Sequence, residues 1–162
     1  MDVREVVKRY VSKLQRTAHI ISEVDMLQSF SIVSDQYSFV RPELSKDRVV
    51  ELIDCRHPVV EQVIRDKYIP NDIIMDKKTT IQLITGPNMA GKSTYMRQFG
   101  ITVIMAQIGC FVPCKKAKLP IFDKIFTRIG ASDDLVSGES TFMVEMKEAT
   151  NAIKNATIAG KA

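Results

Sequence analysis

The chain has 162 residues, 45% of them apolar, and carries 23 basic against 19 acidic side chains. That length suffices for one domain with a hydrophobic core, while a net charge of +4 is too small to establish nucleic-acid binding by itself. No apolar run approaches the roughly 18 residues that a membrane-spanning helix needs, and the N-terminus MDVREVVKRY is charged where a secretory signal would be apolar. We therefore expect a soluble cytoplasmic protein (bacterial cytosol or nucleoid, or nucleus if eukaryotic) with no membrane partner.

The first 41 residues contain neither glycine nor proline, and their apolar side chains recur at steps of three to four residues. This spacing predicts one long helix with a single apolar stripe. A helix of about 28 residues would reach roughly 40 Å, which is more than a compact domain needs. We interpret residues 1–41 as a lever-type helical segment or half of a helical pair. The alternative is an ordinary terminal helix packed along the domain.

Residues 42–162 alternate between strand-like and helical patterns, which predicts an α/β fold. Residues 68–72 are expected to form a loop, as are residues 130–140. Strands are predicted at residues 48–55, 79–84, 110–114 and 121–129. Helices are predicted at residues 59–65 and 92–108, and from Phe142 onward.

The string ITGPNMAGKST, residues 84–94, contains the pattern G-x-x-x-x-G-K-[ST] between a predicted strand and a predicted helix. Gly86 and Gly91 allow backbone N–H groups to turn around phosphate oxygens, and the helix that follows adds the positive end of its dipole. Lys92 is placed to reach the β and γ phosphates, Ser93 to coordinate Mg²⁺, and Thr94 to touch the α phosphate. The alternative is a glycine turn with a surface lysine.

The motif therefore predicts a P-loop NTPase-type sheet flanked by helices and preceded by a long α-helix, with ATP and Mg²⁺ as cofactors. The residues expected to bind the nucleotide are those of the loop: Gly86, Pro87, Asn88, Met89, Ala90, Gly91, Lys92, Ser93 and Thr94.

Several segments together resemble one family. The string TGPNMAGKSTYMRQ is similar to the nucleotide-binding loop of the MutS family of DNA mismatch-repair ATPases. MAQIGCFVP, IFTRIGASDDL and SGESTFMVEM follow in that family's order and spacing, while RHPVVEQ and YIPND resemble its upstream segments. The likeness covers at least residues 56–157, and the long N-terminal helix resembles the family's lever. It implies that residues 42–162 are the N-terminal part of a MutS-type ATPase domain.

The resemblance also implies roles for single residues. Tyr68 would stack on adenine with Ile69 beside it. Without the resemblance, the alternative that Tyr68 is a core residue stays open. Asn88 would bond phosphate or the attacking water, and with Lys92 it forms the catalytic set that the resemblance implies. Ser140 would point across a dimer at the γ phosphate of the neighbour's nucleotide. Simple capping of the next helix by Ser140 or Thr141 is the alternative reading of that position.

In such a family, ATP binding and hydrolysis in a dimer are coupled to binding of mismatched double-stranded DNA, here through domains absent from the chain. Hydrolysis also needs a second hydrophobic strand that ends in acidic residues. No apolar run ending in Asp-Glu follows Ser93. We therefore expect that the sheet is truncated and that this chain alone binds ATP but hydrolyses it poorly.

Two alternatives remain open at this point. The first is a truncated, non-catalytic fragment that binds nucleotide or modulates a partner. The second is an unrelated P-loop kinase or transport ATPase; no acceptor-binding charge cluster follows the loop, and SGEST stands where a transport ATPase would carry a glycine-richer signature.

Overall fold

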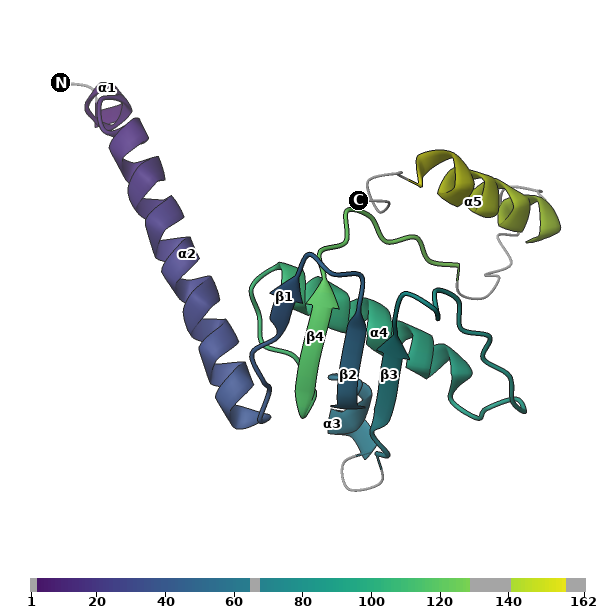
Figure 1. Cartoon of the computed structure of the whole chain (residues 1–162). Helices are drawn as coiled ribbons and strands as arrows, with labels where there is room; N and C mark the ends of the chain where they lie inside the picture. Colours follow the sequence, from purple (N-terminus) through teal and green to yellow (C-terminus); the bar gives the residue numbers. More distant parts are fainter. Residues whose placement is uncertain (1–2, 65–67, 129–140, 157–162) are drawn as a thin grey trace.

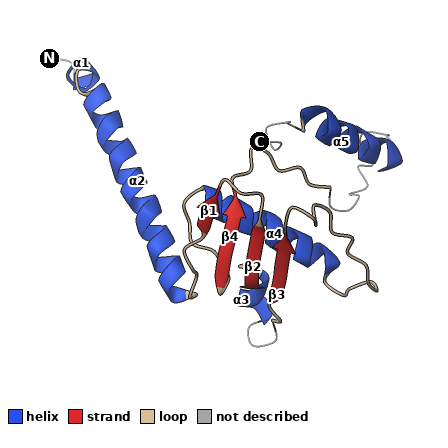
Figure 2. Cartoon of the chain, in the orientation of Figure 1, coloured by secondary structure: helices blue, strands red, loops and turns tan. Residues whose placement is uncertain are grey.

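The computed structural model describes residues 3–64, 68–128 and 141–156, and these form an α/β protein (Figure 1). Its centre is a mixed sheet in which the four described strands lie in the order β1-β4-β2-β3 (Figure 2). The strands are β1 (Glu43–Ser45), β2 (Val50–Cys55), β3 (Asn71–Met75) and β4 (Lys116–Pro120). Strand β1 runs parallel to β4, whereas β2 runs antiparallel to both β4 and β3.

Helix α4 (Lys92–Gln107) lies against one face of this sheet and closes the hydrophobic core (Figure 1). Its Val103 and Ala106 pack with alternate residues of the strands, such as Val50 and Leu52 of β2. Alternation is what a strand with one covered face requires, because successive side chains point to opposite sides. This packing holds helix α4, which follows the glycine loop, against the sheet.

All three cysteines, Cys55, Cys110 and Cys114, are buried with free thiols and behave as small hydrophobic residues.

The N-terminal segment forms two helices instead of one, α1 (Val3–Lys8) and α2 (Val11–Gln36). The backbone N–H groups of Arg9 and Tyr10 bond three residues back, to Val6 and Val7, so the chain tightens into a turn there. The long helix of about 28 residues is found as α2, which has 26 residues; a turn separates it from α1, and the helical part ends at Gln36.

Helix α2 extends away from the sheet, and of its residues Ser34 alone is buried (Figure 1). Its apolar stripe faces outward: Leu14, Ile21, Val24 and Leu27 are each 57–62% exposed. The alternative of a terminal helix packed along the domain is therefore wrong. That residues 1–41 act as a lever stays a prediction.

The predicted strand at residues 79–84, directly before the glycine loop, is not present. Asp76 Oδ1 accepts the N–H groups of Lys78 and Thr79 at 2.8 and 2.7 Å, which turns the chain away from the end of β3. The Gln82 side chain, in place of a backbone ladder, then donates to the Ile74 carbonyl at 3.0 Å. Ile81 and Leu83 are 85% and 89% exposed, so no described strand covers them.

Residues 110–114 form a single bridge in place of the predicted strand. Val112 and Val40 exchange two backbone hydrogen bonds of 2.9 Å, but Pro113 has no N–H with which to continue the ladder. The strand instead begins further on, as β4, whose Ala117 and Leu119 are buried between exposed or half-buried lysines. This strand was missed in the sequence because lysine, alanine and proline have weak strand propensity.

The prediction of a strand at residues 121–129 is also wrong, over the described residues 121–128. Gln107 accepts the Phe122 N–H at 2.7 Å and donates to the Phe122 carbonyl at 2.9 Å. A side chain thus satisfies the backbone groups that a neighbouring strand would otherwise bond.

The remaining predictions mostly hold. The short helix after Pro58 is α3 (Val60–Ile64), and the last helix is α5 (Thr141–Asn155). Two residues of the predicted loop 68–72 belong to β3 instead, and the predicted loop 130–140 lies outside the described residues. The α/β class is confirmed, whereas the P-loop NTPase-type arrangement of the sheet stays a prediction. None of the helices in the described part is both long and apolar enough to cross a membrane.

Candidate functional site

The glycine loop ends at the N-terminus of α4, as the motif predicts. Gly91 precedes the helix with φ of +87°, a left-handed conformation that side chains disfavour, and no side chain caps the first turn. The first N–H groups of a helix have no partner within it, so uncapped they are available to an anion. Ser93 and Thr94 follow in this first turn.

The Lys92 side chain folds back over the loop. Its Nζ donates to the carbonyl oxygens of Gly86 at 2.7 Å and Pro87 at 2.6 Å. An ammonium group carries three donors, and the contacts among the described residues use two of them. The charge is therefore held at the loop with a donor remaining for a phosphate oxygen.

The tip of the loop is exposed. Met89 has φ of +64° and a fully exposed side chain, and the Ala90 N–H bonds the Pro87 carbonyl at 3.3 Å across the turn. Asn88 is exposed as well. Its amide is therefore accessible to a ligand that lies along the loop.

A hollow of about 560 Å³ lies beside the loop, within the range of small-molecule sites. It brings together residues that lie far apart in the sequence, because Tyr68 and Ile69 line it together with Lys92 and Thr94. The full lining is Val60, Ile64, Tyr68, Ile69, Asn71, Ile84, Thr85, Met89, Ala90, Gly91, Lys92, Thr94 and Tyr95.

The other predicted site residues lie elsewhere. Gly86, Pro87, Asn88 and Ser93 belong to the loop and the first turn of α4 but do not line the hollow. Ser140 lies outside the described residues, so its role across a dimer stays a prediction.

Two contributors were missed in the sequence, Gln98 and Tyr95. Gln98 of α4 is fully buried; it accepts the Tyr68 hydroxyl at 2.6 Å and donates to the Cys55 carbonyl at 2.8 Å. Tyr95 lines the hollow and donates its hydroxyl to the Asp72 carbonyl at 3.2 Å. One feature of the sequence could have identified Gln98: it is a long polar residue within the otherwise apolar pattern of a buried helix.

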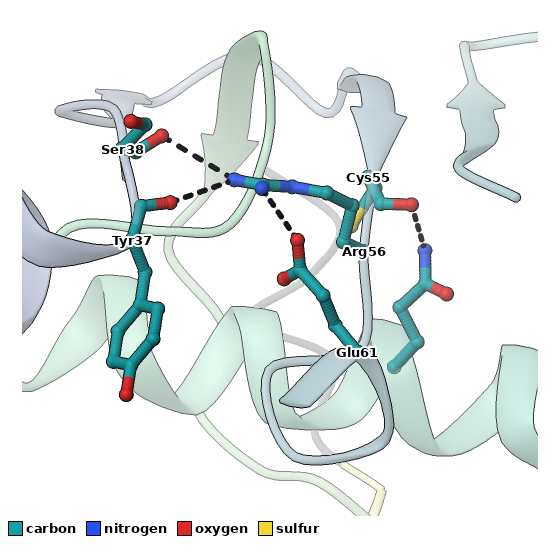
Figure 3. A network of polar contacts seen from close by, with 6 residues as sticks. Tyr37, Ser38, Cys55, Arg56 and Glu61 are labelled. Carbon is teal, nitrogen blue, oxygen red and sulfur yellow. Dashed lines mark hydrogen bonds and ion pairs between the residues drawn. The ribbon is translucent and has the colours of Figure 1, made fainter. Parts of the chain in front are cut away.

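The wall made by α3 is fixed by two side chains that follow β2. The Arg56 guanidinium donates to Glu61 of α3 at 2.6 Å and to the carbonyls of Tyr37 and Ser38, at the C-terminal end of α2 (Figure 3). The buried His57 accepts the N–H groups of Val59 and Val60 at its Nδ1, both at 3.3 Å. His57 therefore has a structural role: it holds the start of α3.

A magnesium ion has one predicted ligand here. Ser93 presents an exposed hydroxyl in the first turn of α4. Within residues 3–64, 68–128 and 141–156, no three His, Cys, Asp or Glu side chains are grouped to hold a metal ion.

These observations define a class: an α/β protein with a glycine loop at the uncapped N-terminus of a core helix, beside a hollow that a tyrosine lines. The family model for MutS domain V matches residues 82–160. Over 158 residues, 97% of the chain, it is 61% identical to the DNA mismatch repair protein MutS of Geobacillus sp. (strain WCH70) and 58% identical to that of Staphylococcus saprophyticus. The chain belongs to the MutS family.

The MutS protein of Bacillus mycoides (strain KBAB4) is 60% identical over 156 residues. The chain spans 18% of the length of each of these three relatives.

Proposed function

We propose that this chain binds ATP with Mg²⁺ and is the nucleotide-binding part of a MutS-type DNA mismatch repair ATPase. The observation that carries the proposal is the hollow that the loop's Lys92 and the distant Tyr68 both line. A cation and an aromatic ring in one hollow of this size support binding of a nucleotide.

The triphosphate would lie along Gly86 to Thr94, held by backbone N–H groups at the start of α4 and by the Lys92 ammonium. The Ser93 hydroxyl would serve Mg²⁺, and the ion would neutralise charge on the β and γ phosphates. At the other end, the base would lie against Tyr68 and Ile69, since a flat aromatic ring favours offset stacking. Asn88 would bond phosphate or orient the attacking water.

In the whole protein, this binding would drive a dimer to change its grip on mismatched double-stranded DNA, with Ser140 reaching the partner's γ phosphate. MutS-family membership and the name of the relatives support this larger role. The projecting helix α2 would transmit the change.

Calorimetric titration of the chain with ATP in excess Mg²⁺ tests the nucleotide site. We expect binding, and Lys92→Ala should weaken it by roughly tenfold or more, since a charge-assisted bond is lost. Lys46→Ala is the matched control, because it removes the same charge from an exposed position outside the hollow. Absence of ATP binding to the wild-type chain would contradict the proposal.

The alternative of a non-catalytic nucleotide-binding or partner-modulating fragment is separated by turnover. Steady release of phosphate from ATP that Lys92→Ala abolishes would exclude it. Binding without turnover would favour it.

A further inference from the structure

Gln98 occupies a position between the hollow and the core. Its side chain is fully buried, and both ends of its amide are bonded, one to the Tyr68 hydroxyl and one to the Cys55 carbonyl. A buried amide is costly unless its groups are paired. The amide of Gln98 therefore links Tyr68 to Cys55 at the end of strand β2. Among the described residues that line the hollow, Tyr68 is the only aromatic one before the loop.

The direction of both hydrogen bonds follows from chemistry. The Cys55 carbonyl can only accept, so the amide NH₂ must face it, at 2.8 Å. The amide oxygen then faces Tyr68 and can only accept, so the Tyr68 hydroxyl must donate, at 2.6 Å. Burial raises the pKa of Tyr68 above its ordinary value, which keeps this donor protonated.

The anchored hydroxyl limits what the ring can do. With its oxygen held by Gln98, the tip of the half-buried Tyr68 ring is fixed, and this keeps the ring at the wall of the hollow. Gln98 lies six residues after Lys92 on the same helix, about 9 Å along its axis. One rigid helix thus carries the phosphate-binding ammonium and the anchor of the ring.

We propose that Gln98 is a positioning residue for the base of the nucleotide: it fixes the hydroxyl end of the Tyr68 ring and so holds the ring at the wall of the hollow, so that affinity for the base, but not for the triphosphate, depends on it. This inference rests on the proposed function, because it assumes that ATP enters the hollow. It adds a determinant of base recognition that does not itself touch the ligand.

The test compares two probes, ATP and inorganic tripolyphosphate, each titrated with excess Mg²⁺ into the chain. Gln98→Met removes both hydrogen bonds at similar volume, and Tyr68→Phe removes the hydroxyl while keeping the ring. Each substitution should lower the affinity for ATP by about three- to tenfold and leave the affinity for tripolyphosphate unchanged. The double variant should lose no more affinity for ATP than the weaker-binding single variant, since both substitutions break the same hydrogen bond between Tyr68 and Gln98.

Gln107→Met is the matched control. Gln107 lies at the end of the same helix and also uses both ends of its amide, on Phe122, but it lies outside the hollow. It should leave the ratio of ATP to tripolyphosphate affinity as in the wild type. Retained tripolyphosphate binding in each variant shows that the loop is folded, and Tyr68→Phe serves alone if Gln98→Met does not fold.

The outcomes separate this inference from the proposed function. If the wild type binds neither probe, both fail. If the wild type binds ATP but Tyr68→Phe leaves the ratio unchanged, or if both probes weaken equally, only the positioning role is overturned.

Discussion

At the scale of single residues, His57 shows how one side chain supports the site without lining it. Its Nδ1 accepts two backbone N–H groups at the start of α3, and α3 contributes Val60 and Ile64 to the hollow. A protonated imidazole has no acceptor, so these bonds require the neutral ring. Burial, with a smaller contribution from the charge of Arg97, lowers the pKa of His57.

We therefore predict that His57 makes the chain less stable in mild acid. Below the ordinary histidine pKa, His57 of the unfolded chain takes up a proton, whereas His57 of the folded chain stays neutral. The folding free energy that His57 contributes is therefore fully present above the ordinary pKa and is lost as the pH falls toward the lowered pKa of the folded chain. Urea midpoints at about pH 8 and about pH 5.5 should differ more in the wild type than in His57→Asn, which can accept at a helix start without titrating. Equal pH dependence in both proteins would contradict this assignment.

At the scale of elements, Arg56 joins three parts of the fold. Its backbone N–H bonds the Pro113 carbonyl before β4, while its guanidinium bonds Glu61 of α3 and the carbonyls of Tyr37 and Ser38, which directly follow α2 (Figure 3). The Arg56 and Glu61 side chains are only 22% and 18% exposed, so solvent screens the pair less than a surface pair. The projecting helix is thus fastened at its C-terminal end to the wall of the hollow.

Arg56→Met should lower the free energy of unfolding by about 2 kcal/mol, because it removes charge-assisted bonds and leaves Glu61 without its partner. Amide hydrogen exchange should also quicken at the end of α2. Lys115→Met breaks only a surface pair with Asp54, at 3.7 Å, and should cost no more than about 1 kcal/mol. The role of Arg56 as a fastener fails if the two variants are equally stable.

At the scale of the whole molecule, much apolar surface is uncovered. The stripe of α2 faces outward, and Ile81 and Leu83 are exposed beside β3, an edge strand of the described sheet. Contiguous exposed apolar surface and unpaired strand edges both favour association. The chain alone therefore presents surfaces suited to contact with other protein.

We predict that the isolated chain associates as its concentration rises, and that a double variant, Ile81→Lys with Leu83→Lys, reduces this association in sedimentation velocity runs. The control is Val59→Lys with Val63→Lys, which adds the same charge at two exposed apolar positions, one directly before helix α3 and one within it. An equal reduction in the control would show that net charge, and not the segment 79–84, is responsible.

The sequence alone predicted those features that local physics determines. The glycine loop, helix α4 and helix α3 were found because glycine conformations, helical periodicity and hydrogen bonds within one segment suffice to specify them. Strand β2 was found for a related reason, since its buried run stands between turn residues.

Only the tertiary structure decided which strands form and what meets at the site. A strand needs a partner from elsewhere in the chain, so residues 79–84 have strand propensity but no ladder, while Lys116–Pro120 has weak propensity and a place between β1 and β2. Likewise, nothing local in the sequence says that Tyr68 bonds Gln98 or lines the same hollow as Lys92. Those contacts arise because packing against the sheet brings distant segments together.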